Sequence, residues 1–254
     1  MLVDYHVHTL GHGEYVNSLE EVIPFFREAS KQGLAHLGIA DHTQLAPRRV
    51  VSALRQANTY FPEVQLRLGF ELDLSRDTQA EIEYALSMPG LDFVIGSVHY
   101  IGDWLFNSPA LKDEFKKRDL SQVYEQYYSR VLSACRTGLF DIVGHLDLIK
   151  LFNPGFPPEG VMPYAEPVLK AIKEAGICVE INTSGLYKPV AEMYPSEEIL
   201  RRCYDYGIPI TFGSDAHTPK EVGRDISLAR QLAKRVGYRQ LATFSKRTRI
   251  TVFF

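Results

Sequence analysis

Three polar side chains occupy alternate positions near the start of the chain, in the stretch Asp4-Tyr5-His6-Val7-His8. In an extended strand side chains alternate between two faces, so Asp4, His6 and His8 lie on the same face. Two imidazoles two residues apart can reach the same ion, and a buried polar face is costly unless something ligates it. The stretch predicts a metal site, although a surface strand with incidental histidines would show the same pattern.

Similar side chains recur where other apolar segments end. These candidates are Asp41, His42, Glu71, Asp73, His99, His145, Asp147, Asn182, Asp215 and His217. Of the eight histidines in the chain, His12 lies in the loop after the first strand, and only His36 falls at the start of a strand. The carboxyl ends of the strands of a closed parallel barrel converge on one mouth. We therefore expect every histidine except His36 to lie at that mouth.

The chemistry of this set points to metal ions. The set contains His, Asp and Glu but no Cys, which excludes thiolate sites and suits Zn²⁺, Mn²⁺ or Fe²⁺. Seven histidines exceed the needs of one ion, so two or three ions are expected. Such clusters suit phosphoryl transfer, because metal ions lower the pKa of bound water and orient the phosphate. The alternative is a set of hydrogen-bonded histidines without metal, in which the cost of burying so many polar groups would not be offset.

The pattern of the intervening segments predicts alternating helices and strands. Amphipathic segments end at Gly33, Gly138, Gly176, Gly207 and Gly237, and an apolar strand follows each within a residue or two. Near-continuous apolar strands are typical of a parallel sheet buried on both faces, and this alternation is typical of βαβ units. The predicted strands are 2–8, 35–41, 65–73, 92–99, 141–146, 178–183 and 209–214. The predicted helices are 18–32, 48–59, 77–87, 120–137, 163–175, 196–206 and 219–236, before a strand-like tail at 250–254. No linker divides the chain, so residues 1–254 are expected to form one domain.

Composition narrows the possible partners. The chain has 254 residues, 45% of them hydrophobic, and a net charge of −3, which predicts no general attraction to nucleic acid or anionic membrane. No run of about 18 apolar residues occurs, so no membrane span is expected. Three cysteines without a C-x-x-C pair predict reduced core thiols in a cytoplasmic protein, and no signal peptide is evident. The oligomeric state stays open.

The motifs together resemble the PHP (polymerase and histidinol phosphatase) superfamily. They are D-x-H-x-H at residues 4–8, "ADH" at 40–42, "GFE" at 69–71, "GSVH" at 96–99, "GH" at 144–145 and "GSDAH" at 213–217. The resemblance implies a distorted seven-stranded (β/α)7 TIM-like barrel with a trinuclear metal centre at the carboxyl ends of the strands. It also implies three ligand sets and two residues, Asp4 and Asp41, that orient ligand histidines. The implied sets are His6, His8, Glu71 and Asp215 for one ion, Glu71, His99 and His145 for the second, and His12, His42 and His217 for the third.

Three longer segments resemble one group within the superfamily. "GSVHYIG", "GLFDIVGHLDLIK" and "NTSGLYKP" are most similar to stand-alone histidinol-phosphate phosphatases. The resemblance implies a metal-dependent phosphomonoesterase that hydrolyses L-histidinol phosphate in histidine biosynthesis. Its partner would be a small phosphorylated substrate, with neither nucleic acid nor membrane.

Several side chains in the expected mouth loops could serve this reaction. Glu71, Asp215 and His217 are the candidate catalytic residues, and the last two could protonate the leaving oxygen. The candidate phosphate-binding residues are Lys150, Lys188 and Arg224, for which solvated surface charge is the alternative. Asp147 or Glu192 could recognise a substrate ammonium. Trp104 and Phe106 could close over an imidazole ring, but ordinary loop packing is the favoured interpretation.

Three other functions remain as alternatives to the phosphomonoesterase. A phosphodiesterase or exonuclease needs a basic track for a nucleic-acid backbone, and the dense basic segment 246–249 lies in the tail. A phosphotyrosine phosphatase would share the metal chemistry. A non-catalytic metal-binding domain with a decayed site should have lost ligands, whereas the set here is complete.

Overall fold

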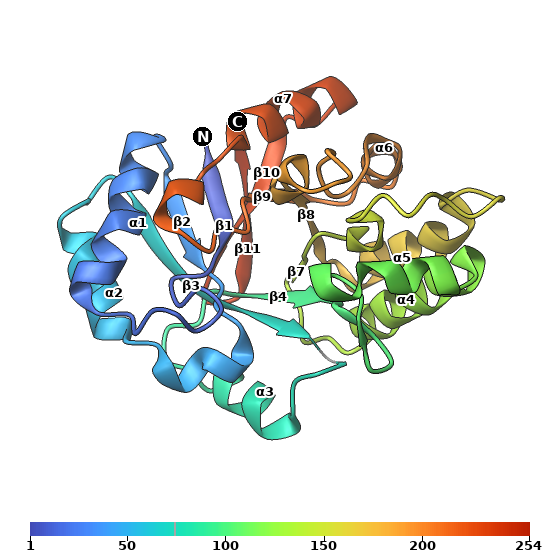
Figure 1. Cartoon of the computed structure of the whole chain (residues 1–254). Helices are drawn as coiled ribbons and strands as arrows, with labels where there is room; N and C mark the ends of the chain where they lie inside the picture. The colour runs from blue at the N-terminus through green and yellow to red at the C-terminus, as the bar shows by residue number, and fades with distance from the viewer. Residues whose placement is uncertain (74) are drawn as a thin grey trace.

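Seven parallel strands form a nearly closed barrel with helices between them (Figure 1). The computed structural model describes residues 1–73 and 75–254. Within these residues the barrel strands follow the order β1-β2-β3-β4-β7-β8-β9, and each neighbouring pair is parallel. The gap between β9 and β1 is bridged just after β9, where the amide of His8 donates to the carbonyl of Ala216 at 2.7 Å. The predicted fold class, a distorted seven-stranded (β/α) barrel, is confirmed.

The elements have the following bounds. The barrel strands are β1 (Val3–Val7), β2 (His36–Ile39), β3 (Gln65–Asp73), β4 (Phe93–Ser97), β7 (Ile142–Val143), β8 (Cys178–Asn182) and β9 (Ile210–Gly213). The helices are α1 (Leu19–Lys31), α2 (Val51–Thr59), α3 (Gln79–Leu86), α4 (Leu120–Cys135), α5 (Met162–Ala175), α6 (Glu197–Asp205) and α7 (Ile226–Val236). Two small hairpins lie outside the barrel, β5 (Tyr100–Ile101) with β6 (Trp104–Leu105), and β10 (Gln240–Ser245) with β11 (Thr248–Phe253). No helix in the described ranges is long and apolar enough to cross a membrane.

Most predicted elements are present, and the differences have local causes. The strand predicted at 141–146 ends at Val143, because the backbone leaves the extended conformation at His145, which has a φ of +23°. The helix predicted at 219–236 is a short 3₁₀ turn followed by α7, because Asp225 interrupts it with a φ of +59°. The strand-like tail is β11, and residues 240–245 form its partner strand.

Helix α1 shows how local sequence places an element. The side chain of Ser18 accepts a hydrogen bond from the backbone amide of Glu21, and the Glu21 carboxylate accepts one from the backbone amide of Ser18. This reciprocal cap satisfies donors that a helix start leaves free. Beyond the other end, Gly33 has a φ of +67°, a conformation that costs glycine little. The helix end predicted at Gly33 is confirmed.

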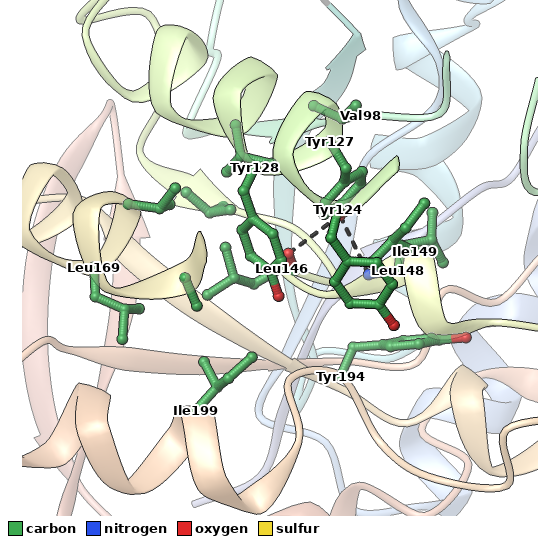
Figure 2. Packing of buried hydrophobic residues seen from close by; sticks show 14 of the residues in the cluster. Val98, Tyr124, Tyr127, Tyr128, Leu146, Leu148, Ile149, Leu169, Tyr194 and Ile199 are labelled. Carbon is green, nitrogen blue, oxygen red and sulfur yellow. Dashed lines mark hydrogen bonds between the residues drawn. The ribbon is translucent and has the colours of Figure 1, made fainter. Parts of the chain in front are cut away.

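A tyrosine-rich layer on α4 supports the segment that follows β7 (Figure 2). The hydroxyl of Tyr127 donates to the carbonyl of Leu146 at 3.1 Å and accepts from the amide of Leu148 at 3.2 Å. The same cluster buries Trp104 and Phe106, which confirms that these aromatic rings serve packing. The layer therefore fixes the loop that carries His145.

The hairpin β10–β11 covers the amino ends of the barrel strands. The amide of Phe244 donates to the hydroxyl of Tyr5 at 2.8 Å, and Arg247 pairs with Asp141 at 2.9 Å. His36 also lies at this end, where its Nδ1 is 2.9 Å from the Tyr5 hydroxyl. The placement predicted for His36, away from the other histidines, is confirmed.

Candidate metal centre and catalytic site

The carboxyl ends of the strands bring the predicted polar side chains together. They surround a cavity of about 850 Å³, which we call the mouth. The predicted site residues that line it are His12, His42, Glu71, His99, His145, Lys188, Asp215, His217 and Arg224. His6 and His8, on and just after β1, are fully buried beneath them.

Glu71 is the centre of the histidine cluster. Its Oε1 lies 3.0 Å from Nε2 of His145 and 3.5 Å from Nε2 of both His6 and His99. Its Oε2 lies 3.0 Å from Nδ1 of His42 and 3.6 Å from Nε2 of His8. One buried carboxylate therefore faces imidazoles from four strand ends.

Asp215 provides a second acidic centre on the other side of β1. Its Oδ1 lies 3.4 Å from Nε2 of His8 and 3.7 Å from Nε2 of His6. Asp215 has a φ of +55°, and His145 is also in the positive-φ region. Such backbone conformations are unfavourable for residues other than glycine, and they concentrate at functional sites.

The cluster shifts the pKa values of its own members. Burial raises the pKa of Glu71, but His6, His99 and His42 outweigh it and hold that pKa well below its usual value. Burial lowers the pKa of His99, but Glu71 and Asp73 raise it to about 9. Burial and the neighbouring imidazoles hold the pKa of His8 well below its usual value. Mutually perturbed groups in a cavity are typical of functional sites.

The geometry fits metal ligation. Within the described residues there are three groups of three residues that could each hold a metal ion. In each group every residue offers one ligand atom, and these atoms lie within 4.8 Å of one another. The groups are His6, His8 and Glu71; Glu71, His99 and His145; and His8, His42 and His217. Nε2 of His6, His8 and His217 and Nδ1 of His8 and His145 are buried without a hydrogen-bond partner in the part of the chain described here. Buried lone pairs of this kind are costly unless a cation occupies the space between them.

Comparison with known proteins places this arrangement in a family. A family model described as PHP domain matches residues 4–184, and one described as PHP-associated matches residues 197–225. The chain belongs to the PHP domain family.

Relatives cover nearly the whole of this PHP domain chain. It is 39% identical over 238 residues to a protein named probable histidinol-phosphatase from Deinococcus radiodurans, with 87% of this chain and 88% of the relative covered. It is 30% identical over 258 residues to a histidinol-phosphatase from Bacillus subtilis, with 87% and 95% covered. A solved histidinol phosphate phosphatase from Lactococcus lactis, complexed with zinc, L-histidinol and phosphate, has a TM-score of 0.75, 24% identity and 98% of each chain covered. That likeness shows a shared fold.

The third group differs from the ligand set implied for the PHP superfamily. His8 joins His42 and His217 in it, in place of His12. The ring of His12 lies 4.1 Å, centre to centre, from the ring of His217, on the exposed side of the mouth. His12 is therefore close enough to take part but lies outside the tightest group.

Asp4 and Asp41, which were expected to orient ligand histidines, accept no hydrogen bond from an imidazole ring among the described residues. Asp4 accepts hydrogen bonds from the amides of Ser214 and Gly223, both at 2.9 Å. Asp41 accepts from the amide of Leu10 at 2.9 Å and pairs with the buried Arg49. Both carboxylates hold backbone segments that carry ligand histidines, so they act on the loops rather than on the rings.

Two carboxylates contact ring nitrogens although neither was predicted to, since Asp73 was expected only as a polar strand end and Glu180 was not singled out. Glu180 on β8 lies 2.7 Å from Nδ1 of His6, and Asp73 on β3 lies 3.0 Å from Nδ1 of His99. A signal for both was present, because each acid stands two residues from another polar residue within an apolar strand, Asn182 and Glu71 respectively. On a strand this spacing puts both side chains on the same face.

Lys150 does not line the mouth, although we expected it to bind phosphate. Its ammonium is buried, 2.9 Å from Asp147 and 2.6 Å from Glu192, and it donates to the carbonyl of Met193. These three side chains border a separate cavity of about 360 Å³. Asp147 and Glu192 both pair with Lys150 beside this second cavity and do not line the mouth, so neither is placed there to recognise a substrate ammonium.

Basic side chains do reach the rim of the mouth from other loops. Lys188 and Arg224 line it as predicted, and Arg76, which the sequence analysis did not single out, joins them. The guanidinium of Arg224 lies 3.6 Å over the ring of Tyr187. These cations offer counter-charges to an anionic ligand above the carboxylates and imidazoles.

Proposed function

We propose that this protein is a metal-dependent phosphomonoesterase that hydrolyses L-histidinol phosphate to L-histidinol and phosphate. The observation that carries the proposal is the set of buried, unpartnered imidazole nitrogens around Glu71 and Asp215, beneath a rim of cations. Histidinol-phosphatase relatives at 39% and 30% identity over most of the chain support this choice of substrate.

The residues present would hold two or three divalent transition-metal ions, of which Zn²⁺, Mn²⁺ and Fe²⁺ suit the ligands. The three groups named above, with Asp215 between His6 and His8, would be their ligands. Ions in such a site would activate water, neutralise the phosphate and stabilise the departing oxygen. Glu71 would be shared between groups, because its two oxygens face different imidazoles.

The remaining steps fall to side chains of the chain itself. Lys188 and Arg224 would hold the phosphate from the rim, and Arg76 is placed to assist. The ring of His217 donates from Nδ1 to the carbonyl oxygen of Asp215 at 3.0 Å, since a carbonyl can only accept. The lone pair on Nε2 of His217 then suits ligation better than proton donation. We therefore assign His217 to ligation rather than to protonation of the leaving alcohol, and Asp215 likewise, because its Oδ1 faces Nε2 of both His6 and His8.

A substrate panel tests the proposal. Phosphate release is measured on protein reconstituted with Zn²⁺ or Mn²⁺, with L-histidinol phosphate, phosphotyrosine and a dinucleotide as alternatives. We expect L-histidinol phosphate to have the highest kcat/KM, by at least ~100-fold. A site that hydrogen-bonds the polar groups of its substrate discriminates strongly against compounds that lack those groups. Preference for phosphotyrosine or the dinucleotide would replace the proposal with the corresponding alternative.

Histidine variants separate the site from the rest of the fold. His99→Ala and His145→Ala should each lower bound metal and turnover together, because both rings belong to one ligand group. His36→Asn is the matched control, since His36 lies at the opposite end of the barrel and should leave both quantities unchanged. Wild-type turnover in metal-free His99→Ala or His145→Ala protein would refute the mechanism.

A further inference from the structure

The carboxylate of Glu180 joins two parts of the histidine cluster that are otherwise held by different strands. Its Oε1 lies 2.7 Å from Nδ1 of His6, and Nε2 of the same ring faces Glu71. Its Oε2 accepts from the amide of His145 at 2.8 Å and from the side-chain amide of Asn182 at 3.0 Å. Glu180 is fully buried, so water does not compete for these bonds.

The two histidines that Glu180 contacts belong to different ligand groups. His6 is grouped with His8 and Glu71, whereas His145 is grouped with Glu71 and His99. The contact to His6 fixes a ring, and the contact to His145 fixes a backbone that has a φ of +23°. One side chain therefore acts on the ring orientation in one group and on the loop conformation in the other.

The glycine at the end of β9 leaves room for this carboxylate. A Cβ on Gly213 would lie 1.8 Å from Oε1 of Glu180 and 2.7 Å from Cβ of His6. A Cβ on Gly144 would lie 2.8 Å from Oγ of Ser97 and 3.4 Å from Oε2 of Glu180. No side chain would therefore fit between Gly213 and Glu180, whereas the 3.4 Å distance at Gly144 is an ordinary van der Waals contact.

We propose that Glu180 is a positioning residue that holds the ring of His6 and the backbone of His145 at the same time. Two of the metal-ligand groups would then depend on this one side chain. The proposal rests on the proposed function, because it assumes that these groups hold metal ions. A carboxylate that accepts from the far nitrogen of a ligand histidine fixes the tautomer and orientation of the ring.

Asp73 provides the natural comparison. Its Oδ2 contacts Nδ1 of His99 at 3.0 Å and accepts from the amide of the same residue at 2.8 Å. Both contacts act on a single histidine in a single ligand group. Loss of Asp73 should weaken one group, whereas loss of Glu180 should weaken two.

The isosteric variant Glu180→Gln exposes this difference. His6 Nδ1, the His145 amide and the Asn182 amide are all donors to Glu180, so both of its oxygens must accept. A glutamine has one accepting oxygen and one donating nitrogen. Either orientation of the glutamine amide leaves at least one of the two histidines facing a donor.

The experiment measures ion binding without substrate, so a failure of the proposed phosphatase activity does not affect it. Zn²⁺ binding to metal-free protein is titrated against a chromophoric chelator, which resolves the stoichiometry and the successive affinities. We expect Glu180→Gln to lower the affinity for two of the Zn²⁺ ions by about 10- to 100-fold, and Asp73→Asn to lower the affinity for one ion by a similar factor. Asp141→Asn, at the amino end beside Arg247, is the control and should bind Zn²⁺ as the wild type does. Wild-type affinities in Glu180→Gln, or weakening of only one ion, would overturn the proposal.

A second measurement stands even if Glu180→Gln does not fold. In wild-type protein labelled with ¹⁵N-histidine, His6 should carry its proton on Nδ1, with a downfield imidazole resonance that exchanges slowly with water. Assignment of that resonance uses the His6→Asn variant. A His6 ring protonated on Nε2 in the zinc-bound protein would remove the donor on which the Glu180 contact depends and would refute the proposal.

Discussion

The two ends of the barrel use the same strands but treat their polar groups in opposite ways. At the amino end, the Tyr5 hydroxyl, His36 and Asp141 each have a partner supplied by the hairpin β10–β11 or by a neighbouring strand. At the mouth, Nε2 of His6 and both ring nitrogens of His8 lack a hydrogen-bond partner within residues 1–73 and 75–254.

The difference shows which end serves stability and which serves chemistry. Paired buried groups contribute to folding, whereas unpaired ones cost free energy unless a ligand completes them. Tyr5 and His6 are adjacent in sequence, yet the first belongs to the paired end and the second to the unpaired cluster. The comparison predicts that substitutions at the two ends separate stability from turnover.

Glu71→Gln should have the largest effect. Its oxygens face imidazoles from four strand ends, and the substitution removes the negative charge they share. We expect kcat to fall by about 10³-fold, while the free energy of unfolding of the metal-free protein changes by less than about 1 kcal/mol. Turnover is measured by phosphate release and stability by urea unfolding. A variant that keeps its turnover would show that Glu71 is not central to the chemistry.

Tyr5→Phe should have the reverse effect. The variant leaves the buried amide of Phe244 and Nδ1 of His36 without their partner. We expect the free energy of unfolding to fall by about 2 kcal/mol, with kcat and bound metal unchanged. Tyr127→Phe is the matched variant near the mouth, because that hydroxyl holds the loop that carries His145. It should lose similar stability and also turnover, and equal turnover in the two variants would contradict the division between the ends.

The rim cations sharpen the comparison within the mouth itself. Lys188→Ala and Arg224→Ala should each lower kcat/KM for a phosphate monoester by about tenfold, through the loss of one charge-assisted contact. Lys150→Met should leave kcat/KM unchanged, because the Lys150 ammonium forms ion pairs with Asp147 and Glu192 and does not line the mouth. Undiminished kcat/KM in both rim variants would remove Lys188 and Arg224 from the site.

Much of this arrangement could be predicted because it depends on strand ends. Apolar strands that stop at His, Asp or Glu identify both the barrel and its mouth, since parallel strands all present their carboxyl ends to one side. His36 was separable for the same reason, because it begins a strand instead of ending one. The position of a residue along its strand carries this information without any knowledge of side-chain contacts.

What could not be predicted depends on contacts between distant segments. Lys150 lies in a mouth loop by sequence, but a neighbouring loop supplies Glu192 and turns its ammonium inward. Asp4 has the spacing of a ring partner, yet its oxygens bind amides more than 200 residues away in sequence, at Ser214 and Gly223. Spacing within one strand sets the face of a side chain but not what the neighbouring loops place in front of it.

The smallest predicted effect is a pH dependence at the amino end. Burial, aided by the charge of Arg67, lowers the pKa of His36 to about 4, against a usual value of 6.5. The Tyr5 hydroxyl accepts from the Phe244 amide, so it donates its own proton to Nδ1 of His36, which must stay unprotonated. A lowered pKa in the folded state means that the unfolded chain binds the proton first. The stability from His36 is therefore complete above pH 6.5 and is lost as the pH falls toward 4.

The comparison of wild type with His36→Asn isolates this contribution from the titrating groups of the mouth. Asparagine keeps an acceptor for the Tyr5 hydroxyl but does not titrate, so its unfolding free energy lacks the His36 component. Between pH 7 and pH 5, wild type should lose about 1 kcal/mol more than the variant in urea unfolding. Equal losses would mean that His36 is as easily protonated in the folded protein as in the unfolded chain. The paired network of the amino end would then not extend to this histidine, and the contrast between the two ends would rest on Tyr5 and the hairpin alone.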